Sequence, residues 1–207
     1  MGNTSSDFVK GSELVQGSLF GVDSMQNPEF DLTQIETIFD PRVRLCMDTS
    51  GTGVKFSALL SYKEAVKVGS IEAGSKPHKQ DYQIKEFEVN PDCRAPLIGN
   101  EIFCCIIVLC SELGLISGRI PVTAIVDTEI ASVLREVLRS ARLEESDFTR
   151  RSSPNLWHDQ ESGMSNTLTT FTFNNVPKLI ALCRIYLGDN LRVIEELLQE
   201  HESAKSH

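Results

Sequence analysis

Residues 83–114, QIKEFEVNPDCRAPLIGNEIFCCIIVLCSELG, constrain the fold more than any other part of this chain. They begin in an alternating run, roughly 82–90, that predicts a strand. Pro91 cannot donate to a strand ladder and therefore ends the strand. The run over 100–113 is apolar on most faces and predicts a buried helix, which Gly114 ends. The stretch is thus a strand, a turn and a core helix, as in proteins that mix α and β structure.

The turn over 92–99 adds a chemical constraint. Backbone N–H groups at a helix start have no partner within the helix, and the helix dipole is positive there. A turn that feeds a helix therefore suits a phosphate group. Side chains of the preceding strand alternate between two faces. We expect Phe87 and Val89 on one face, and Ile84, Glu86 and Glu88 on the other.

Charge and composition limit the partners. The chain has 207 residues and a formal net charge of −9, so its surface repels phosphates and disfavours nucleic acid and anionic membranes. Its six cysteines include no CxxC pair and no spacing typical of a metal site, which predicts a reduced, cytoplasmic protein without a structural metal. The apolar run over 102–110 is too short to be a transmembrane segment.

The N-terminus carries one targeting pattern. Residues 1–6, MGNTSS, fit the myristoylation pattern M-G-x-x-x-[ST], so membrane anchoring is expected only if Gly2 is lipidated. The alternative is a flexible arm over 1–28, which is rich in Gly, Ser, Asn and Gln.

The remaining patterns predict one main domain over 29–175 and a helical extension over 176–207. A helix is expected over 31–39 and an amphipathic one over 129–141, whereas the polar residues 144–165 predict a long loop. The apolar stripe of the last helix must be buried against the protein's own core or a second subunit. The strands are expected at 42–48, 54–62, 65–73, 120–126 and 167–173, and the last helices at 177–187 and 189–200.

The turn resembles the acyl-CoA-binding motif of the GCN5-related N-acetyltransferase (GNAT) superfamily, Gln/Arg-x-x-Gly-x-Gly/Ala between a strand and a helix. Arg94 and Gly99 match the first and last positions, and Leu97 replaces the middle glycine. The ending ELG at 112–114 is also similar. The resemblance implies an α/β (α+β) fold: a GNAT-like mixed, mostly antiparallel twisted sheet flanked by helices, with a C-terminal helical extension.

The same resemblance implies a site and a reaction. An acyl group would move from an acyl thioester, acyl-CoA or acetyl-CoA, or one on acyl carrier protein, to an amine on a small molecule or a protein, without a metal. The base would be Glu86 or Glu88, and a base there should be partly desolvated. The backbone of the central strand would pair with pantetheine, and the turn would bind the pyrophosphate. The implied cofactor-binding residues are Phe87, Val89, Arg94, Ala95, Leu97, Ile98, Gly99 and Asn100.

Two departures from the family pattern keep a second interpretation open. Leu97 adds a side chain where close approach of a pyrophosphate favours glycine. Arg135 stands where the family has a tyrosine acid, and arginine cannot donate a proton at neutral pH. Acyl-homoserine-lactone synthases and the nodulation acyltransferase share the layout. The alternative function is a catalytically inactive GNAT-like fold that binds a protein, as an effector or a homodimer, through its last helix.

Overall fold

The computed structural model describes residues 32–50, 53–61, 63–75, 82–118, 121–126, 131, 132, 134, 135, 138, 139, 144, 146–154 and 167–205. The predicted arm over 1–28, with Gly2, lies outside them. The strands are β1 (Val43–Ser50), β2 (Gly53–Leu60), β3 (Lys63–Ser75), β4 (Tyr82–Val89), β5 (Val122–Val126), β6 (Phe148–Pro154) and β7 (Thr167–Phe173). The helices are η1 (Leu32–Gln34), α1 (Ala95–Glu112), α3 (Val176–Leu187), η2 (Gly188–Asn190) and α4 (Leu191–Lys205).

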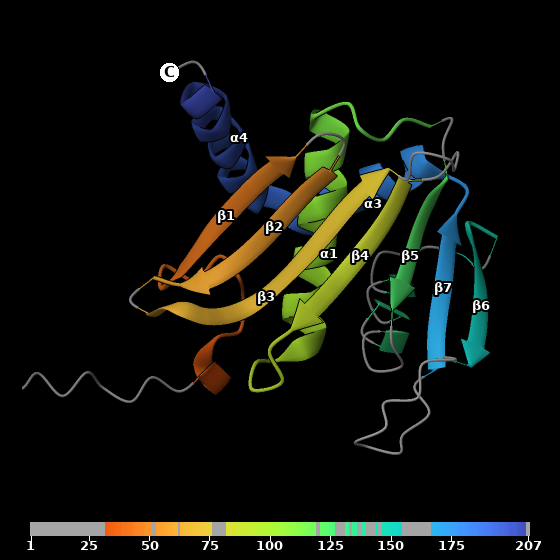
Figure 1. Cartoon of the computed structure of the whole chain (residues 1–207), viewed down its shortest axis with the longest axis horizontal. Coiled ribbons are helices and arrows are strands. Elements are labelled where there is room, and N and C mark those ends of the chain that lie inside the picture. The colour runs from red at the N-terminus through yellow and green to blue at the C-terminus, as the bar shows by residue number, and fades with distance from the viewer. Residues whose placement is uncertain are drawn as a thin grey trace, which may run out of the picture. The chain divides into compact units, whose positions relative to one another are not determined.

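The strands form one sheet in the order β1-β2-β3-β4-β5-β7-β6. The β4–β5 pair is parallel, and the other pairs are antiparallel. Parallel neighbours need a crossover, and α1 supplies it between β4 and β5 (Figure 1). The predicted fold class, a mostly antiparallel mixed sheet flanked by helices and followed by a C-terminal helical extension, is confirmed.

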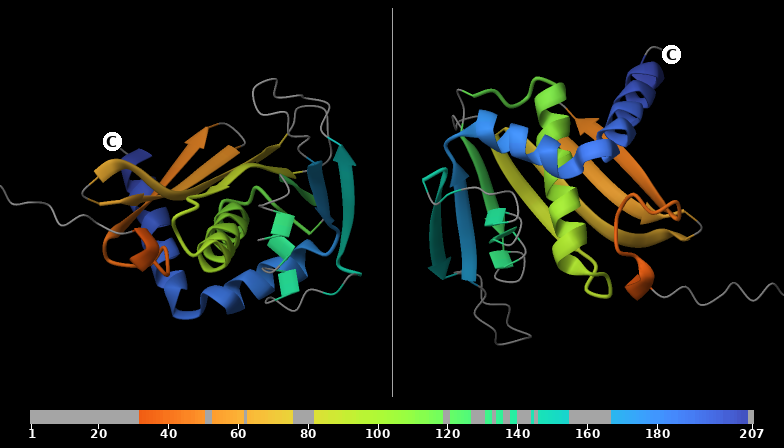
Figure 2. Two further views of the ribbon diagram at one scale, coloured as in Figure 1. Left: turned by 90° about the horizontal axis from the view of Figure 1, so that it is seen from below. Right: turned by 180° about the vertical axis from the view of Figure 1, so that it is seen from behind.

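Helix α1 lies at the centre of the core, as its sequence predicts. Every residue from Ile102 to Cys110 is buried, and α1 packs against β2, β3 and β4. In β2 the alternate residues Val54, Phe56, Ala58 and Leu60 are buried. Helices α1 and α3 lie on the same side of the sheet (Figure 2). The burial of apolar side chains between α1 and this face is the main source of stability.

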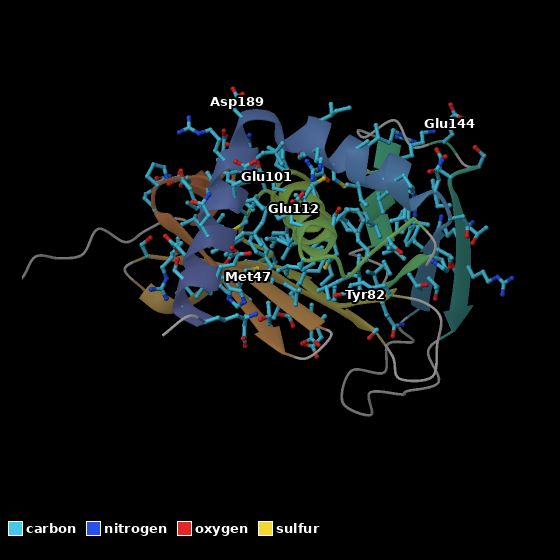
Figure 3. All side chains as sticks on the ribbon, turned by 90° about the horizontal axis from the view of Figure 1, so that it is seen from above. Met47, Tyr82, Glu101, Glu112, Glu144 and Asp189 are labelled. Atoms are coloured by element: carbon cyan, nitrogen blue, oxygen red, sulfur yellow. The ribbon has the colours of Figure 1, made fainter. Side chains whose placement is uncertain are left out.

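Helix α3 packs across α1 on the side away from the sheet. Glu101 and Glu112 both project from the side of α1 that faces α3 (Figure 3), and Glu112 forms an ion pair with Arg184 of α3. At the sheet side of α1, Tyr82 accepts a hydrogen bond from Cys110 at 3.6 Å. Gly114 has φ +68°, so the predicted end of the helix at this glycine is confirmed.

The helix expected over 31–39 is wrong in extent, because only Leu32–Gln34 is helical and as a 3-10 turn. The N–H of Ile38 donates to Glu101 Oε2 at 2.7 Å, and the N–H of Phe39 donates to Thr37 Oγ1 at 3.2 Å. These backbone N–H groups therefore donate to side-chain oxygens, whereas in a continuing helix they would donate to backbone carbonyls.

Two other boundaries differ from expectation. Helix α1 begins at Ala95, not near residue 100, because Pro96 fits the first turn of a helix, where its missing N–H is no loss. The loop expected over 144–165 contains β6, which pairs with β7 along its whole length. Its sequence, FTRRSSP, lacks the apolar alternation of a half-buried strand.

The helix expected over 129–141 is helical at the residues described there, and the predicted stripe residues Leu134 and Leu138 are buried.

Candidate functional site

Strand β4 carries an irregularity at the centre of the candidate site. Its pairing with β3 shifts between Glu72↔Lys85 and Ser70↔Glu88, so Ile71 alone opposes Glu86 and Phe87. This two-against-one pairing is a β-bulge, and Glu86 has φ +47°, a conformation unusual for a residue with a side chain. After the bulge, each side chain of β4 points to the face opposite to the one that simple alternation predicts.

The expectation that Ile84 and Phe87 face opposite sides is therefore wrong. Both side chains are buried, with Ile84 at 1% and Phe87 at 6% exposure, and the ring of Phe87 lies 6.5 Å from that of Phe103 in α1. The extra residue at the bulge brings Phe87 to the face that α1 covers.

Strands β4 and β5 part after Ile84, just before the bulge. They pair only at Tyr82↔Val122, Gln83↔Thr123 and Ile84↔Ala124. The remainder of β5 stays paired with β7, through Ile125↔Thr170 and Val126↔Thr169. Figure 1 shows the two strands diverging from their paired ends. The β4 backbone over 85–89 thus has no strand partner on this side within the described chain, and an unpaired edge can bond an extended ligand.

The turn after β4 has few unused donors. The N–H groups of Asp92 and Cys93 donate to Asn90, to its Oδ1 and its carbonyl oxygen, both at 3.0 Å. The N–H groups of Leu97 and Ile98 donate to the carbonyl of Arg94, at 3.1 and 3.2 Å.

Since Pro96 has no N–H, this leaves the amides of Arg94 and Ala95 without a protein acceptor in the described region. They lie at the positive end of the helix dipole of α1, where anions are favoured.

The side chains at this helix start divide into two groups. Leu97 is 42% exposed. Ile98, Gly99 and Asn100 are buried within α1, because the helix begins five residues earlier than expected. The guanidinium of Arg94 pairs with Glu36 at 2.8 Å, and both side chains are well exposed. An exposed pair of this kind is weak, so an anionic ligand can displace it.

The two candidate bases lie on the exposed side of β4. Glu88 Oε2 accepts a hydrogen bond from Lys67 Nζ at 2.7 Å, and this bond holds the pKa of Glu88 below its ordinary value. This lowered pKa is the opposite of the raised pKa that desolvation would give a base at this position. Glu86 is exposed and sits on the bulge itself.

Two buried amides lie close to the site: Asn100, which the sequence predicts as a cofactor-binding residue, and Gln83, which it does not single out. The side chains of Gln83 and Asn100 are each 3% exposed, and their oxygens, Gln83 Oε1 and Asn100 Oδ1, have no hydrogen-bond partner in the described structure. A buried oxygen without a donor is costly unless water or a ligand reaches it. Gln83 stands one residue before the strands part, and only tertiary structure reveals its burial.

Cys93 and Cys110 are poor candidates for a nucleophile. Burial raises the pKa of Cys93, beside the turn, and the pKa of Cys110 to about 12. A thiol with a raised pKa carries little of the reactive thiolate at neutral pH.

No protein-family model and no curated protein matches the sequence. Among solved structures, the chain is similar to a CoA-dependent acyl-homoserine lactone synthase, MesI, with 14% identity and a TM-score of 0.39, over 67% of this chain and 70% of that one. It is also similar to nourseothricin acetyltransferase, with 12% identity and a TM-score of 0.41, over 63% of this chain and 83% of that one. These low identities and TM-scores do not locate a functional site. The candidate site therefore rests on the geometry of this chain.

Two kinds of feature are absent from the described residues. No helix there is long and apolar enough to cross a bilayer. No group of three or more His, Cys, Asp or Glu side chains gathers there in a metal-binding arrangement.

Proposed function

We propose that the protein binds an acyl thioester of coenzyme A in the opening between β4 and β5 and transfers the acyl group to an amine. The observation that carries this proposal is the parting of β4 from β5 directly after Ile84, next to the bulge at Glu86. A pantetheine arm carries amide groups in an extended chain, and it can pair with the unpaired backbone of residues 85–89, which includes Phe87 and Val89.

The start of α1 is the proposed diphosphate site. The amides of Arg94 and Ala95 donate, and the guanidinium of Arg94 adds a charge-assisted bond when it leaves Glu36. Leu97 borders this space, whereas Ile98, Gly99 and Asn100 support it from inside the helix. With two amides in place of a full glycine-rich cradle, binding depends strongly on Arg94.

The reaction needs a neutral amine. Its nitrogen attacks the thioester carbonyl carbon, the C–S bond breaks, the sulfur leaves as the thiolate of coenzyme A, and a base takes the amine proton. We assign the base to Glu86 in preference to Glu88, because the bond from Lys67 lowers the pKa of Glu88 and weakens it as a base.

A thermal-shift series with CoA, acetyl-CoA and longer acyl-CoAs tests binding. A ligand at one hundred times its dissociation constant stabilises by about 2.7 kcal/mol, a rise of roughly 5–11 °C in Tm for a chain of this size. Arg94→Gln should abolish most of the rise, and Arg192→Gln, an exposed arginine on α4, should not. If no thioester raises Tm, the proposal fails and the inactive binding fold is favoured.

A second experiment tests the base once an acceptor amine is found. Glu86→Gln should lower kcat by about 10²–10⁴ while CoA binding is retained. Lys67→Met removes the bond that lowers the pKa of Glu88, so it should leave the pH–rate profile unchanged if Glu86 is the base. A shift of the acidic limb of that profile in Lys67→Met would reassign the role to Glu88.

A further inference from the structure

A pocket of about 300 Å³ lies against β6 and β7. The described residues that line it are Arg135, from the helical segment after β5, Phe148 and Arg150 of β6, and Phe171 of β7. Arg150 and Phe171 are directly opposed in the β6–β7 register. Phe148 and Arg150 are two residues apart on β6 and so share a face, whereas Arg151 points to the other side.

Within the described part of the chain, no carboxylate neutralises Arg135 or Arg150. Neither forms an ion pair with any residue that the structure describes, although the chain carries a net charge of −9. The nearest acidic residue along β6, Asp147, is already engaged. Its Oδ2 accepts from Lys178 Nζ at 2.5 Å and from the N–H of Glu144 at 3.0 Å. Two like charges lining one small pocket repel each other, and a bound anion removes that repulsion.

Aromatic rings form the rest of the wall that the described residues make. The ring of Phe148 lies 6.1 Å from that of Phe171 and 6.2 Å from that of Phe173. Phe171 is fully buried, whereas Phe148 is only partly buried, so the cluster presents apolar surface where it borders the pocket. Apolar walls with a few convergent polar groups are typical of small-ligand sites.

We propose that this pocket binds a small organic anion, a carboxylate carried on an apolar ring or short acyl body. The planar guanidinium groups of Arg135 and Arg150 match a carboxylate through paired N–H donors, and the phenylalanines cover the apolar body. The volume is at the lower end for ligand pockets, so it accommodates a molecule near the size of benzoate, not a nucleotide. The site does not depend on the acyltransferase proposal.

Titration of the full chain with sodium benzoate, followed by calorimetry and by ligand-observed NMR, tests the site. A fragment of this size should bind with a dissociation constant on the order of 1 mM. Benzamide, which keeps the ring without the charge, and acetate, which keeps the charge without the ring, should each bind at least tenfold more weakly.

Variants test whether the named arginines hold the ligand. Arg135→Gln and Arg150→Gln should each weaken benzoate binding at least tenfold, and Arg151→Gln, the matched control on the other face of β6, should leave it within twofold. The Tm of each variant without ligand checks that it is folded. The proposal is overturned if benzoate does not bind, if the control loses binding as much as Arg150→Gln does, or if inorganic phosphate binds as tightly as benzoate.

Discussion

Gly69 is the position where the seating of α1 on the sheet can be tested most directly. A Cβ at residue 69 would lie 2.3 Å from Ile102 Cδ1 and 2.9 Å from the carbonyl oxygen of Glu88. Ordinary contacts begin near 3.4 Å, so the first distance is short by about 1.1 Å. Ile102 is completely buried in α1, and the carbonyl oxygen of Glu88 belongs to the backbone.

Gly69→Ala should therefore destabilise the protein. Overpacking of a filled core costs about 1–3 kcal/mol. Alanine is favoured over glycine in a strand by about 0.5–1 kcal/mol, which offsets part of that cost. The net loss should be up to about 2.5 kcal/mol in urea unfolding, a fall in Tm of up to roughly 10 °C.

A double-mutant cycle with Ile102→Val identifies the source of this loss. Valine lacks the Cδ1 atom, and alone it should cost about 0.5–1.5 kcal/mol. In Gly69→Ala/Ile102→Val the loss should be smaller than the sum of the two single losses by about 1 kcal/mol. Strict additivity, or a Gly69→Ala protein as stable as the wild type, would refute the close contact between α1 and β3.

Two further predictions concern pH. Burial raises the pKa of Glu101, so its contribution to stability is present when the carboxyl is protonated and is lost as pH rises through the raised pKa. Glu101→Gln should flatten the dependence of the urea-unfolding free energy on pH on the acidic side of neutrality, without lowering stability at pH 7.5. An unchanged pH dependence would contradict this. The bond from Lys178 lowers the pKa of Asp147, so its contribution is present at neutral pH and is lost as pH falls below the ordinary aspartate range. Asp147→Asn should lower Tm at pH 7 but not at the acidic limit, and Lys178→Met should behave alike; a loss of equal size at both pH values would point to a packing defect.

Much of the fold could be predicted because its signals are local. The apolar character of residues 102–110 predicts a buried helix in any tertiary context, and Gly114 ends it by its backbone freedom. The hairpin of β1 and β2 follows from two alternating runs around a glycine-rich turn. Strand β6 could not be predicted, because its polar residues are held by backbone pairing to β7, which sequence periodicity does not report.

The candidate site was predicted only in part. The order of strand, turn and helix was predicted, and Leu97 in that turn is exposed, whereas the binding residues themselves stay a prediction. The number of unused amides, the ion pair of Arg94 with Glu36 and the bond of Lys67 to Glu88 each join residues distant in sequence. Such contacts depend on how the elements pack, so no local sequence pattern predicts them.

By itself, the sequence determined the central strand, the buried helix after it and the succession of elements, because periodicity, proline and glycine act within a few residues. Tertiary structure alone decided where β4 leaves β5, that Glu86 takes the bulge, and that Arg135 and Arg150 line the same pocket as two phenylalanines. Each of these depends on strand register and helix docking, which are fixed only when segments far apart in the chain compete for the same partners.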